Sequence, residues 1–244
     1  MRLDVFMIKF DEEDADAHWA RLRAIAPQAI LIEGVSGIRA AHAECARRAS
    51  TSHFFVVDAD NWVLDGFSFE LTFQPRDDEV AVWRAKNPIN GLVYGHGGIK
   101  LLASETFCGV KHVKEPGVDV ATSLTHRYRK IPVLASEHRF NTTPLLTWRS
   151  AFRECAKLAT YSGREAALRL AAWCSIANAA RHSTWCLQGA CDGRDYGRKN
   201  IGSPEKMNLV NDYTWLQGRF IEQHGRTIRL ARDEAQKVMP AFSS

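Results

Sequence analysis

The first sixty residues alternate between strand and helix patterns, and this order limits the folds open to the chain. Apolar spacing predicts strands and helices in turn, at 3–10, 14–26, 29–33, 34–50 and 53–61. A strand followed by a helix and a second strand forms a right-handed crossover between parallel strands. The sequence therefore predicts an α/β fold with a Rossmann-like, mostly parallel sheet that is flanked by helices.

The next part of the chain predicts a less regular continuation of the sheet. Residues 67–73 and 80–85 alternate between apolar and polar side chains and predict an antiparallel hairpin. A short helix is expected to open near Gly98, and 130–136 predicts a further strand. Together these elements indicate a core at residues 1–140.

From Thr143 onward the apolar spacing is that of amphipathic helices. Four helices are predicted, at 143–160, 163–180, 204–224 and 228–239. No linker in this part is long enough to separate independent domains. We therefore expect residues 141–244 to form a basic helical region that packs on the core as one unit.

Charge is distributed unevenly along the chain. Residues 1–125 carry 13 basic and 18 acidic side chains, whereas residues 126–244 carry 19 basic and 10 acidic ones, so the net charges are −5 and +9. A basic half is typical of proteins that contact a polyanion, and also of solvated basic surfaces. An early acidic N-terminus, the lack of a long apolar run and six scattered cysteines predict a cytoplasmic protein without a membrane partner.

The strongest chemical signal is Asp58-Ala59-Asp60, at the end of the third predicted strand. Open α/β sheets bind ligands at the edge where the carboxyl ends of their strands meet, so both carboxylates are expected to face one cavity. Carboxylates bind Mg²⁺ or Mn²⁺, which complete their coordination with substrate phosphates. The pair predicts a Mn²⁺ or Mg²⁺ site that neutralises a departing diphosphate. A solvated acidic turn is the alternative.

The sequence before this pair contains three candidate nucleotide contacts. Glu33 ends the second predicted strand, where it is placed to accept hydrogen bonds from a base or ribose. Arg39 and His42 lie about one turn apart on the following helix and are candidate diphosphate contacts. The expected donor site is therefore Glu33, Arg39, His42, Asp58 and Asp60.

Three stretches of the chain resemble known glycosyltransferases. GVSGIRAAHAECARRASTSHFFVVDADN resembles the nucleotide-sugar half of a family 2-like glycosyltransferase of the GT-A fold. VWRAKNPINGLVYGHGGIKLL (82–102) and EHRFNTTPLLTWRSAFRECAKL (137–158) resemble more specifically the TET-associated glycosyltransferases. Members of that family are encoded largely by phages and act on hydroxymethylated pyrimidines in DNA. The resemblance covers roughly residues 3–200.

The resemblance implies a donor, a metal and an acceptor. The donor is a nucleoside diphosphate-sugar, in particular a UDP-sugar. The acceptor is 5-hydroxymethylcytosine in double-stranded DNA, and a phage protein of this kind acts in the cytoplasm of its host. By analogy, Asp58 contacts the donor ribose or the metal, and Asp60 ligates the metal directly. A downstream histidine often completes such a site; His138 is the candidate and His182 the reserve. Glu33 stands where the family more usually has Asp.

Transfer to a hydroxyl predicts two further sets of residues. If the reaction inverts the anomeric centre, it needs a general base, and the sequence does not choose among Glu137, Asp119 and Asp77. The resemblance implies that the glycine-rich stretch contacts the acceptor, through Trp83, Asn87, His96, Gly97, Gly98 and Lys100.

The basic half supplies the candidate DNA contacts. Lys and Arg side chains neutralise phosphates and give most of the affinity, while the modified base is reached in the major groove or after flipping. The glycine-rich segment 191–202 predicts a flexible DNA-contacting loop. The candidate phosphate contacts are Arg149, Arg153, Arg194, Arg198 and Lys199.

Several alternatives stay open at this stage. The acceptor could instead be hydroxymethyluracil, a protein, a lipid or a glycan, and neither the sugar, the anomeric outcome nor the oligomeric state is determined. A nucleotidyltransferase would release pyrophosphate from an NTP at a similar site, and a non-catalytic DNA-binding module would need no metal. The chain has neither GxxxxGK[ST] nor GxGxxG, which argues against ATPases, kinases and dehydrogenases. A zinc site is weakly indicated, because no CxxC knuckle joins Cys174, His182, Cys186 and Cys191.

Overall fold

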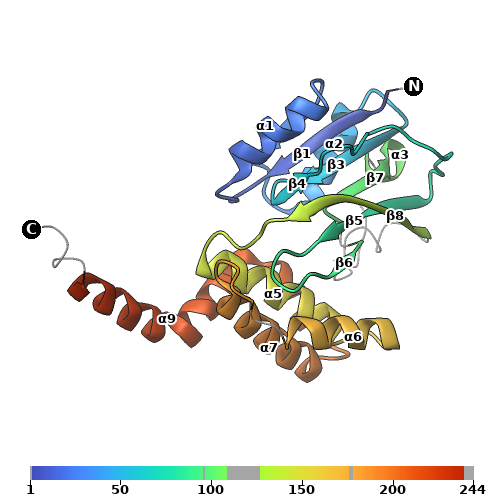
Figure 1. The fold of residues 1–244 in the computed structure, drawn as a ribbon. Coiled ribbons are helices and arrows are strands. Elements are labelled where there is room, and N and C mark those ends of the chain that lie inside the picture. The colour runs from blue at the N-terminus through green and yellow to red at the C-terminus, as the bar shows by residue number, and fades with distance from the viewer. Residues whose placement is uncertain (1, 96, 109–126, 176–177, 239–244) are drawn as a thin grey trace, which may run out of the picture.

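The computed structural model describes residues 2–95, 97–108, 127–175 and 178–238, with side chains described as far as residue 225. A sheet covered by helices forms one part of the molecule, and a group of helices lies beneath it (Figure 1). The strands are β1 (Asp4–Lys9), β2 (Ile30–Glu33), β3 (His53–Asp58), β4 (Asn61–Val63), β5 (Glu79–Lys86), β6 (Val93–Tyr94), β7 (Ile99–Ala103) and β8 (Arg127–His138). The α-helices are α1 (Ala15–Ile25), α2 (Ile38–Arg48), α3 (Ser104–Cys108), α5 (Pro144–Leu158), α6 (Arg164–Trp173), α7 (Ser183–Lys199), α8 (Pro204–Asn208) and α9 (Tyr213–Val238).

The described strands form one mixed, curled sheet. Their order is β2-β1-β3-β7-β5-β8-β4, and β6 pairs with β5. Strand β1 is parallel to β2 and β3, as predicted, and β5 is parallel to β8. The other pairs, β3–β7, β5–β7, β4–β8 and β5–β6, are antiparallel. The α/β class is confirmed, but the prediction of a mostly parallel sheet is wrong because β7 lies between β3 and β5 and runs against both.

Two local predictions in this region are also wrong. The segment 67–73 contains no strand. Its aromatic side chains cover the sheet instead: Phe69 lies 5.1 Å from Phe55 and Phe67 lies 6.1 Å from Trp83, between ring centroids. The helix expected near Gly98 is the buried strand β7, and the helix α3 begins only after it.

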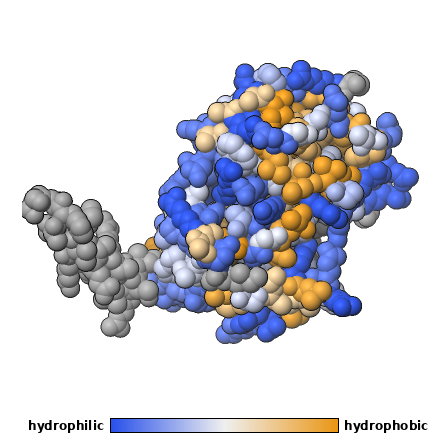
Figure 2. Space-filling model, viewed as in Figure 1, coloured by the Kyte–Doolittle hydropathy of each residue, from blue (hydrophilic) through white to orange (hydrophobic). Residues whose placement is uncertain are grey.

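Apolar side chains of the sheet pack into one cluster on each face. In β1, Val5 and Met7 contribute to the cluster that α1 covers, and Phe6 and Ile8 contribute to the cluster that α2 and α3 cover. Burial on both faces explains why β1 and β3 are continuous apolar runs. On the side drawn in Figure 2, hydrophobic residues gather over the sheet.

Helices α5 and α7 pack at very short range because α7 presents glycines to α5. Gly189, Gly193 and Gly197 recur every four residues and therefore lie on one face of α7. A Cβ atom built at Gly193 would lie 2.2 Å from the carbonyl oxygen of Phe152 on α5, and at Gly189 and Gly197 it would lie 2.3 Å from other carbonyl oxygens of α5. The prediction that 191–202 is a flexible loop is wrong, since 191–199 belong to α7 and Gly193 and Gly197 serve helix packing.

The last part of the chain forms one long helix rather than the two that were predicted. After α8 and a short 3₁₀ turn at Leu209–Asn211, α9 runs without a break from Tyr213. Figure 1 shows its C-terminal half extending beyond the other helices. Among the helices that the structure describes, none is both long and apolar enough to cross a membrane.

Candidate active site

A cavity of about 430 Å³ lies at the carboxyl ends of β1 and β3, between the sheet and the helical region. Its walls come from the ends of these strands, the start of α2, one face of α5 and the first turn of α9. Asp58 and Asp60 both line it. The prediction that the two carboxylates face one cavity therefore agrees with the structure.

Asp60 contacts His138 inside this cavity. The Oδ2 atom of Asp60 lies 2.9 Å from Nε2 of His138, which also lines the cavity. Antiparallel pairing of β4 and β8 sets Asn61 opposite His138 and so brings the two side chains together. Burial disfavours a charged ring, but the negative charges of Asp60 and Asp58 outweigh it and raise the pKa of His138.

Asp58 forms an ion pair with Lys100 of β7. The Nζ atom of Lys100 donates to Oδ1 and Oδ2 of Asp58 at 2.8 and 3.1 Å, and to the carbonyl oxygen of Gly97 at 2.7 Å. Lys100 is only 5% exposed. Burial raises the pKa of Asp58, although the ammonium of Lys100 opposes this shift. Lys100 was predicted to contact the acceptor; the structure shows that it holds Asp58.

The turn before Lys100 needs its two glycines. Gly97 has φ +91°, a conformation that side chains with a Cβ rarely adopt. A Cβ atom at Gly98 would lie 2.2 Å from Oδ1 of Asn61. Gly97 lines the cavity, whereas Gly98 allows the turn to approach β4. Gly97 therefore contributes to the cavity wall, and its contact with an acceptor stays a prediction.

Lys100→Met is expected to destabilise the fold by about 2–3 kcal/mol, because it leaves the Asp58 carboxylate without its partner. About a third of the Asp58 side chain is exposed (32%), which keeps the cost below that of a fully buried charge. Urea unfolding measures the change. The double variant with Asp58→Asn should recover most of the loss; if the single variant unfolds like the wild type, the ion pair has no structural role.

Asp60 and His138 are residue types that bind Mg²⁺ or Mn²⁺. In this structure Oδ2 of Asp60 and Nε2 of His138 are bonded directly to each other at 2.9 Å, so an ion would have to replace this contact and take the place of the proton between them. Asp58 fits less well, because Lys100 already holds both of its oxygens. The described residues contain no group of three or more His, Cys, Asp or Glu side chains that could hold a metal. The other coordination positions would have to come from the donor and from water.

The remaining predicted donor contacts divide in two. His42 lines the cavity and is 3% exposed. Glu33 does not line it and forms an ion pair with Lys9 at 2.8 Å. Arg39 is also absent from the cavity wall. The structure therefore brings together His42, Asp58 and Asp60 of this set, and leaves Glu33 and Arg39 outside.

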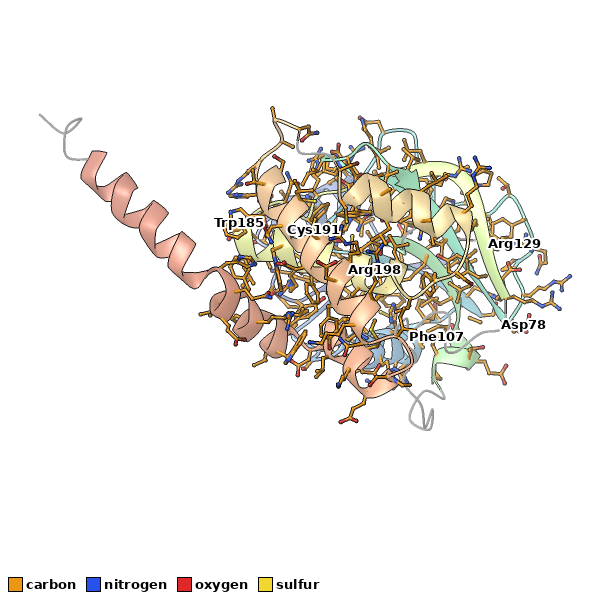
Figure 3. The ribbon with its side chains drawn as sticks, turned by 90° about the horizontal axis from the view of Figure 1, so that it is seen from below. Asp78, Phe107, Arg129, Trp185, Cys191 and Arg198 are labelled. Atoms are coloured by element: carbon orange, nitrogen blue, oxygen red, sulfur yellow. The ribbon has the colours of Figure 1, made fainter. Side chains whose placement is uncertain are left out.

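Neither of the predicted general bases that the structure describes lines the cavity. Glu137 is paired with Arg139 at 2.8 Å. Asp77 lies 3.6 Å from His53 at the amino end of β3, whereas the cavity is at the carboxyl end. Figure 3 shows its neighbour, Asp78, on the outside of the molecule. The third candidate, Asp119, falls outside the described residues.

Two predicted acceptor contacts have structural roles instead. Trp83 is 5% exposed and packs in the core with Phe55. The Oδ1 atom of Asn87 accepts hydrogen bonds from the backbone N–H groups of Ile89 and Asn90, at 2.8 and 3.2 Å, so that it closes a turn. His96 falls outside the described residues.

Two of the predicted phosphate contacts are engaged within the protein. Arg149 binds Asp11 through two hydrogen bonds, of 2.7 and 2.8 Å, and is 8% exposed. Arg153 lines the cavity, but its Nε donates to the carbonyl oxygen of Val210 at 2.9 Å. The prediction that Arg149 contacts DNA phosphates is wrong, because its charge is already neutralised. Arg153 is likewise held by the protein.

The other basic candidates lie on α7. Arg194 is paired with Asp195 at 2.8 Å. Arg198 and Lys199 are exposed near the end of the helix, and Figure 3 labels Arg198 on this element. Helix α7 packs against α5, and it is α5 that lines the cavity. Arg198 and Lys199 therefore lie on a helix outside the cavity wall.

The part of the cavity that α5 forms was not predicted from the sequence. Ser150, Arg153, Glu154 and Lys157 all line it. Their spacing is i, i+3, i+4 and i+7, a polar stripe on a helix whose other residues are mostly buried, and this pattern was available in the sequence. Further cavity residues that were missed are Glu12, Tyr94, Tyr128, Trp173, Asp212 and Tyr213.

The cysteines of the helical region do not form a metal site among the described residues. His182, the reserve metal ligand, bonds to the carbonyl oxygen of Thr142 at 3.0 Å. Among the described cysteines, Cys174 is the one whose pKa is lowered: a hydrogen bond from Cys155 is the main cause that brings it to about 6, and the charge of Arg194 adds to it.

Cys174 is therefore expected to be the first thiol that iodoacetamide modifies at pH 7, because the thiolate is the reactive form. Its rate should rise between about pH 5 and pH 7 and then level off, since the group is fully ionised above its pKa of about 6. Peptide mass spectrometry after brief labelling measures this. A rate that still rises steeply above pH 8 would contradict the assignment.

No protein-family model and no curated protein matches the chain, so the resemblance to the TET-associated glycosyltransferases stays a prediction. Among solved structures, the chain is similar to the mannosyltransferase PcManGT from Pyrobaculum calidifontis, in complex with GDP-Man and Mn²⁺, with a TM-score of 0.40 and 10% identity over 90% of this chain and 87% of that one. It is also similar to HddC from Yersinia pseudotuberculosis, with a TM-score of 0.35 and 16% identity over 53% of this chain and 70% of that one. These are distant similarities of overall fold.

Proposed function

We propose that the protein is a glycosyltransferase that binds a nucleoside diphosphate-sugar in the cavity described above. One observation carries this proposal: Asp58 and Asp60, two residues apart at the end of a central strand, both line one cavity, and His138 contacts Asp60 there. A cavity of this size is typical of sites for small ligands. The shared cavity and the contact with His138 favour this proposal over a solvated acidic turn.

The residues present suit a division of roles. Asp60 and His138 would hold Mn²⁺ or Mg²⁺, and the bound ion would neutralise the diphosphate as it leaves. Asp58 is fixed by Lys100 and so is a rigid hydrogen-bond acceptor, which suits a hydroxyl of the donor ribose. The aromatic side chains of Tyr94 and Trp173 line the same cavity and offer apolar surface to a sugar ring.

The products of the reaction test the proposal. The protein is incubated with UDP-, GDP-, ADP- and TDP-sugars and Mn²⁺, and the released nucleotide is identified. A glycosyltransferase releases a nucleoside diphosphate, whereas a nucleotidyltransferase supplied with an NTP and a sugar phosphate releases pyrophosphate. Release of pyrophosphate alone would replace the proposed function by the second one.

We assign the role of general base to Glu154. It lines the cavity on α5, the hydroxyl of Tyr94 donates to its Oε1 at 2.9 Å, and its charge contributes to the raised pKa of His138. A carboxylate in this place is held by a neighbour and lies near the Asp60–His138 pair. Of the other acids in the wall, Glu12 lies on the β1 side and has its pKa raised to about 7 by burial.

Glu154→Gln is expected to lower kcat about 10²-fold or more with little change in KM for the donor, because amide replaces the proton acceptor while the bond from Tyr94 can persist. Steady-state kinetics with a fixed acceptor measures it. Glu70→Gln is the matched control, since Glu70 is exposed and lies outside the cavity wall. A Glu154 variant with kcat within twofold of the wild type contradicts the assignment.

The proposed acceptor is the hydroxymethyl group of 5-hydroxymethylcytosine in DNA. Its support is the net charge of +9 over residues 126–244 and the resemblance of residues 82–102 and 137–158 to the TET-associated family. The test compares duplexes with cytosine, hydroxymethylcytosine and hydroxymethyluracil in the presence of donor and Mn²⁺. A mass gain of one sugar on the hydroxymethylcytosine duplex alone supports this acceptor; sugar transfer only to a glycan, lipid or protein removes it.

A further inference from the structure

The amino end of α2 forms a part of the cavity wall that the proposed metal site does not use. This helix of 11 residues begins after Gly37, which has no side chain to cap it, and its first turn contains no acidic residue. The backbone N–H groups of Gly37, Ile38 and Ala40 have no acceptor within the described part of the chain. Ser36, Gly37 and Ile38 line the cavity. Uncapped N–H groups and the helix dipole both favour an anion at such a place.

His42 is an independent sign that this wall binds a ligand. His42 is only 3% exposed and lines the cavity. Neither ring nitrogen has a hydrogen-bond partner among the described residues. Buried polar groups in proteins are nearly always hydrogen-bonded. A ligand atom in the cavity is therefore the natural partner for this ring.

The surroundings keep His42 neutral. Burial is the main cause that lowers the pKa of His42, and the charge of Lys100 acts in the same direction, against a weaker opposite effect of the Ile38 carbonyl. A neutral imidazole has one N–H donor and one acceptor nitrogen. Lys100 itself offers no spare donor, because its three contacts are to Asp58 and Gly97.

We propose that the first turn of α2, together with Ser36 and His42, is a phosphate subsite that binds a phosphate group of a nucleotide or phosphorylated sugar without a metal ion. The uncapped N–H groups and the N–H of His42 supply donors to the phosphate oxygens. The acceptor nitrogen of His42 suits a hydroxyl next to the phosphate, which nucleotides and phosphorylated sugars both carry. Assigning the phosphate to the sugar donor rests on the proposed function; metal-free binding of a phosphate does not.

Ala40 provides a direct test, because it is exposed at the third position of α2. Ala40→Glu places a carboxylate where it accepts the free N–H groups and repels an anion, and Ala40→Gln has the same shape without the charge. Binding of inorganic phosphate and of UDP is measured by calorimetry in EDTA. The wild type and Ala40→Gln are expected to bind, and Ala40→Glu to bind at least tenfold more weakly with no loss of Tm.

His42→Leu supplies the second arm of the experiment. It removes both unpartnered ring nitrogens, so it is expected to weaken phosphate and UDP binding at least threefold while Tm stays equal or rises. If binding of UDP and phosphate is absent in the wild type, or is equal in Ala40→Glu and Ala40→Gln, the subsite is overturned. Binding of inorganic phosphate without UDP supports the subsite and assigns it to a ligand other than the donor.

The test of the phosphate subsite and the test of the transferase activity can fail independently. Transfer of sugar depends on Asp60 and Mn²⁺, whereas metal-free binding depends on α2 and His42. If no sugar nucleotide is consumed but Ala40→Glu still weakens phosphate binding, the subsite stands and the transferase proposal falls.

Discussion

Asp60→Asn is expected to lower metal-dependent release of nucleoside diphosphate about 10²- to 10³-fold. The amide has the shape of the carboxylate but lacks the charge that holds a divalent cation, and the loss acts where negative charge develops on the leaving group. The fold should change by no more than about 1 kcal/mol, because Asn at this position can still bond to His138. Turnover is measured over a range of Mn²⁺ concentrations with the sugar nucleotide that the wild type uses.

Asp65→Asn is the matched control for this substitution. The Asp65 side chain is 95% exposed and pairs with Arg21 at the surface, away from the cavity wall. Its variant should keep the wild-type turnover and metal dependence. If Asp60→Asn also keeps both, the metal is not held at Asp60 and the proposed mechanism of leaving-group stabilisation fails.

Gly193→Ala is expected to destabilise the protein by about 3 kcal/mol, although alanine gains about 1 kcal/mol in helix propensity over glycine. The added Cβ atom would lie 2.2 Å from the carbonyl oxygen of Phe152, so α5 and α7 would have to separate. Because α5 carries Glu154 and Lys157 in the cavity wall, activity should fall together with stability. Thermal and urea unfolding measure the first effect and turnover the second.

Gly218→Ala is the control with the opposite expected sign. Gly218 lies on α9, and a Cβ atom there would meet nothing within 4 Å. Helix propensity should then act alone and stabilise the protein by about 0.5–1 kcal/mol. Equal effects at Gly193 and Gly218 would show that close helix packing does not explain the glycines of α7.

The parts of the fold that the sequence predicted are those set by local periodicity. The alternation in the first sixty residues gave β1, α1, β2, α2 and β3 because each element has its own apolar spacing. Strand β7 was not recognised, since five buried residues after two glycines are as consistent with a helix start as with a strand. Its place between β3 and β5 depends on partners that are distant in sequence, and no local pattern encodes them.

The candidate site was predictable to the same extent. Asp58 and Asp60 were found because they end an apolar strand, and His138 because of a family resemblance. Arg149 was misassigned because its partner, Asp11, lies 138 residues earlier in the chain and only the folded structure joins them. Glu154 was missed although it belongs to a polar stripe on α5, because the stripe shows a helix face but not that the face closes a cavity.

A crystal grown with UDP and Mn²⁺ and measured at the manganese absorption edge would locate the metal and the nucleotide together. One anomalous peak is expected in the cavity, about 2.1–2.2 Å from a carboxylate oxygen of Asp60 and Nε2 of His138, with the nucleotide phosphates completing the coordination. Nucleotide bound outside this cavity, or a manganese peak that contacts neither Asp60 nor His138, would contradict this expectation.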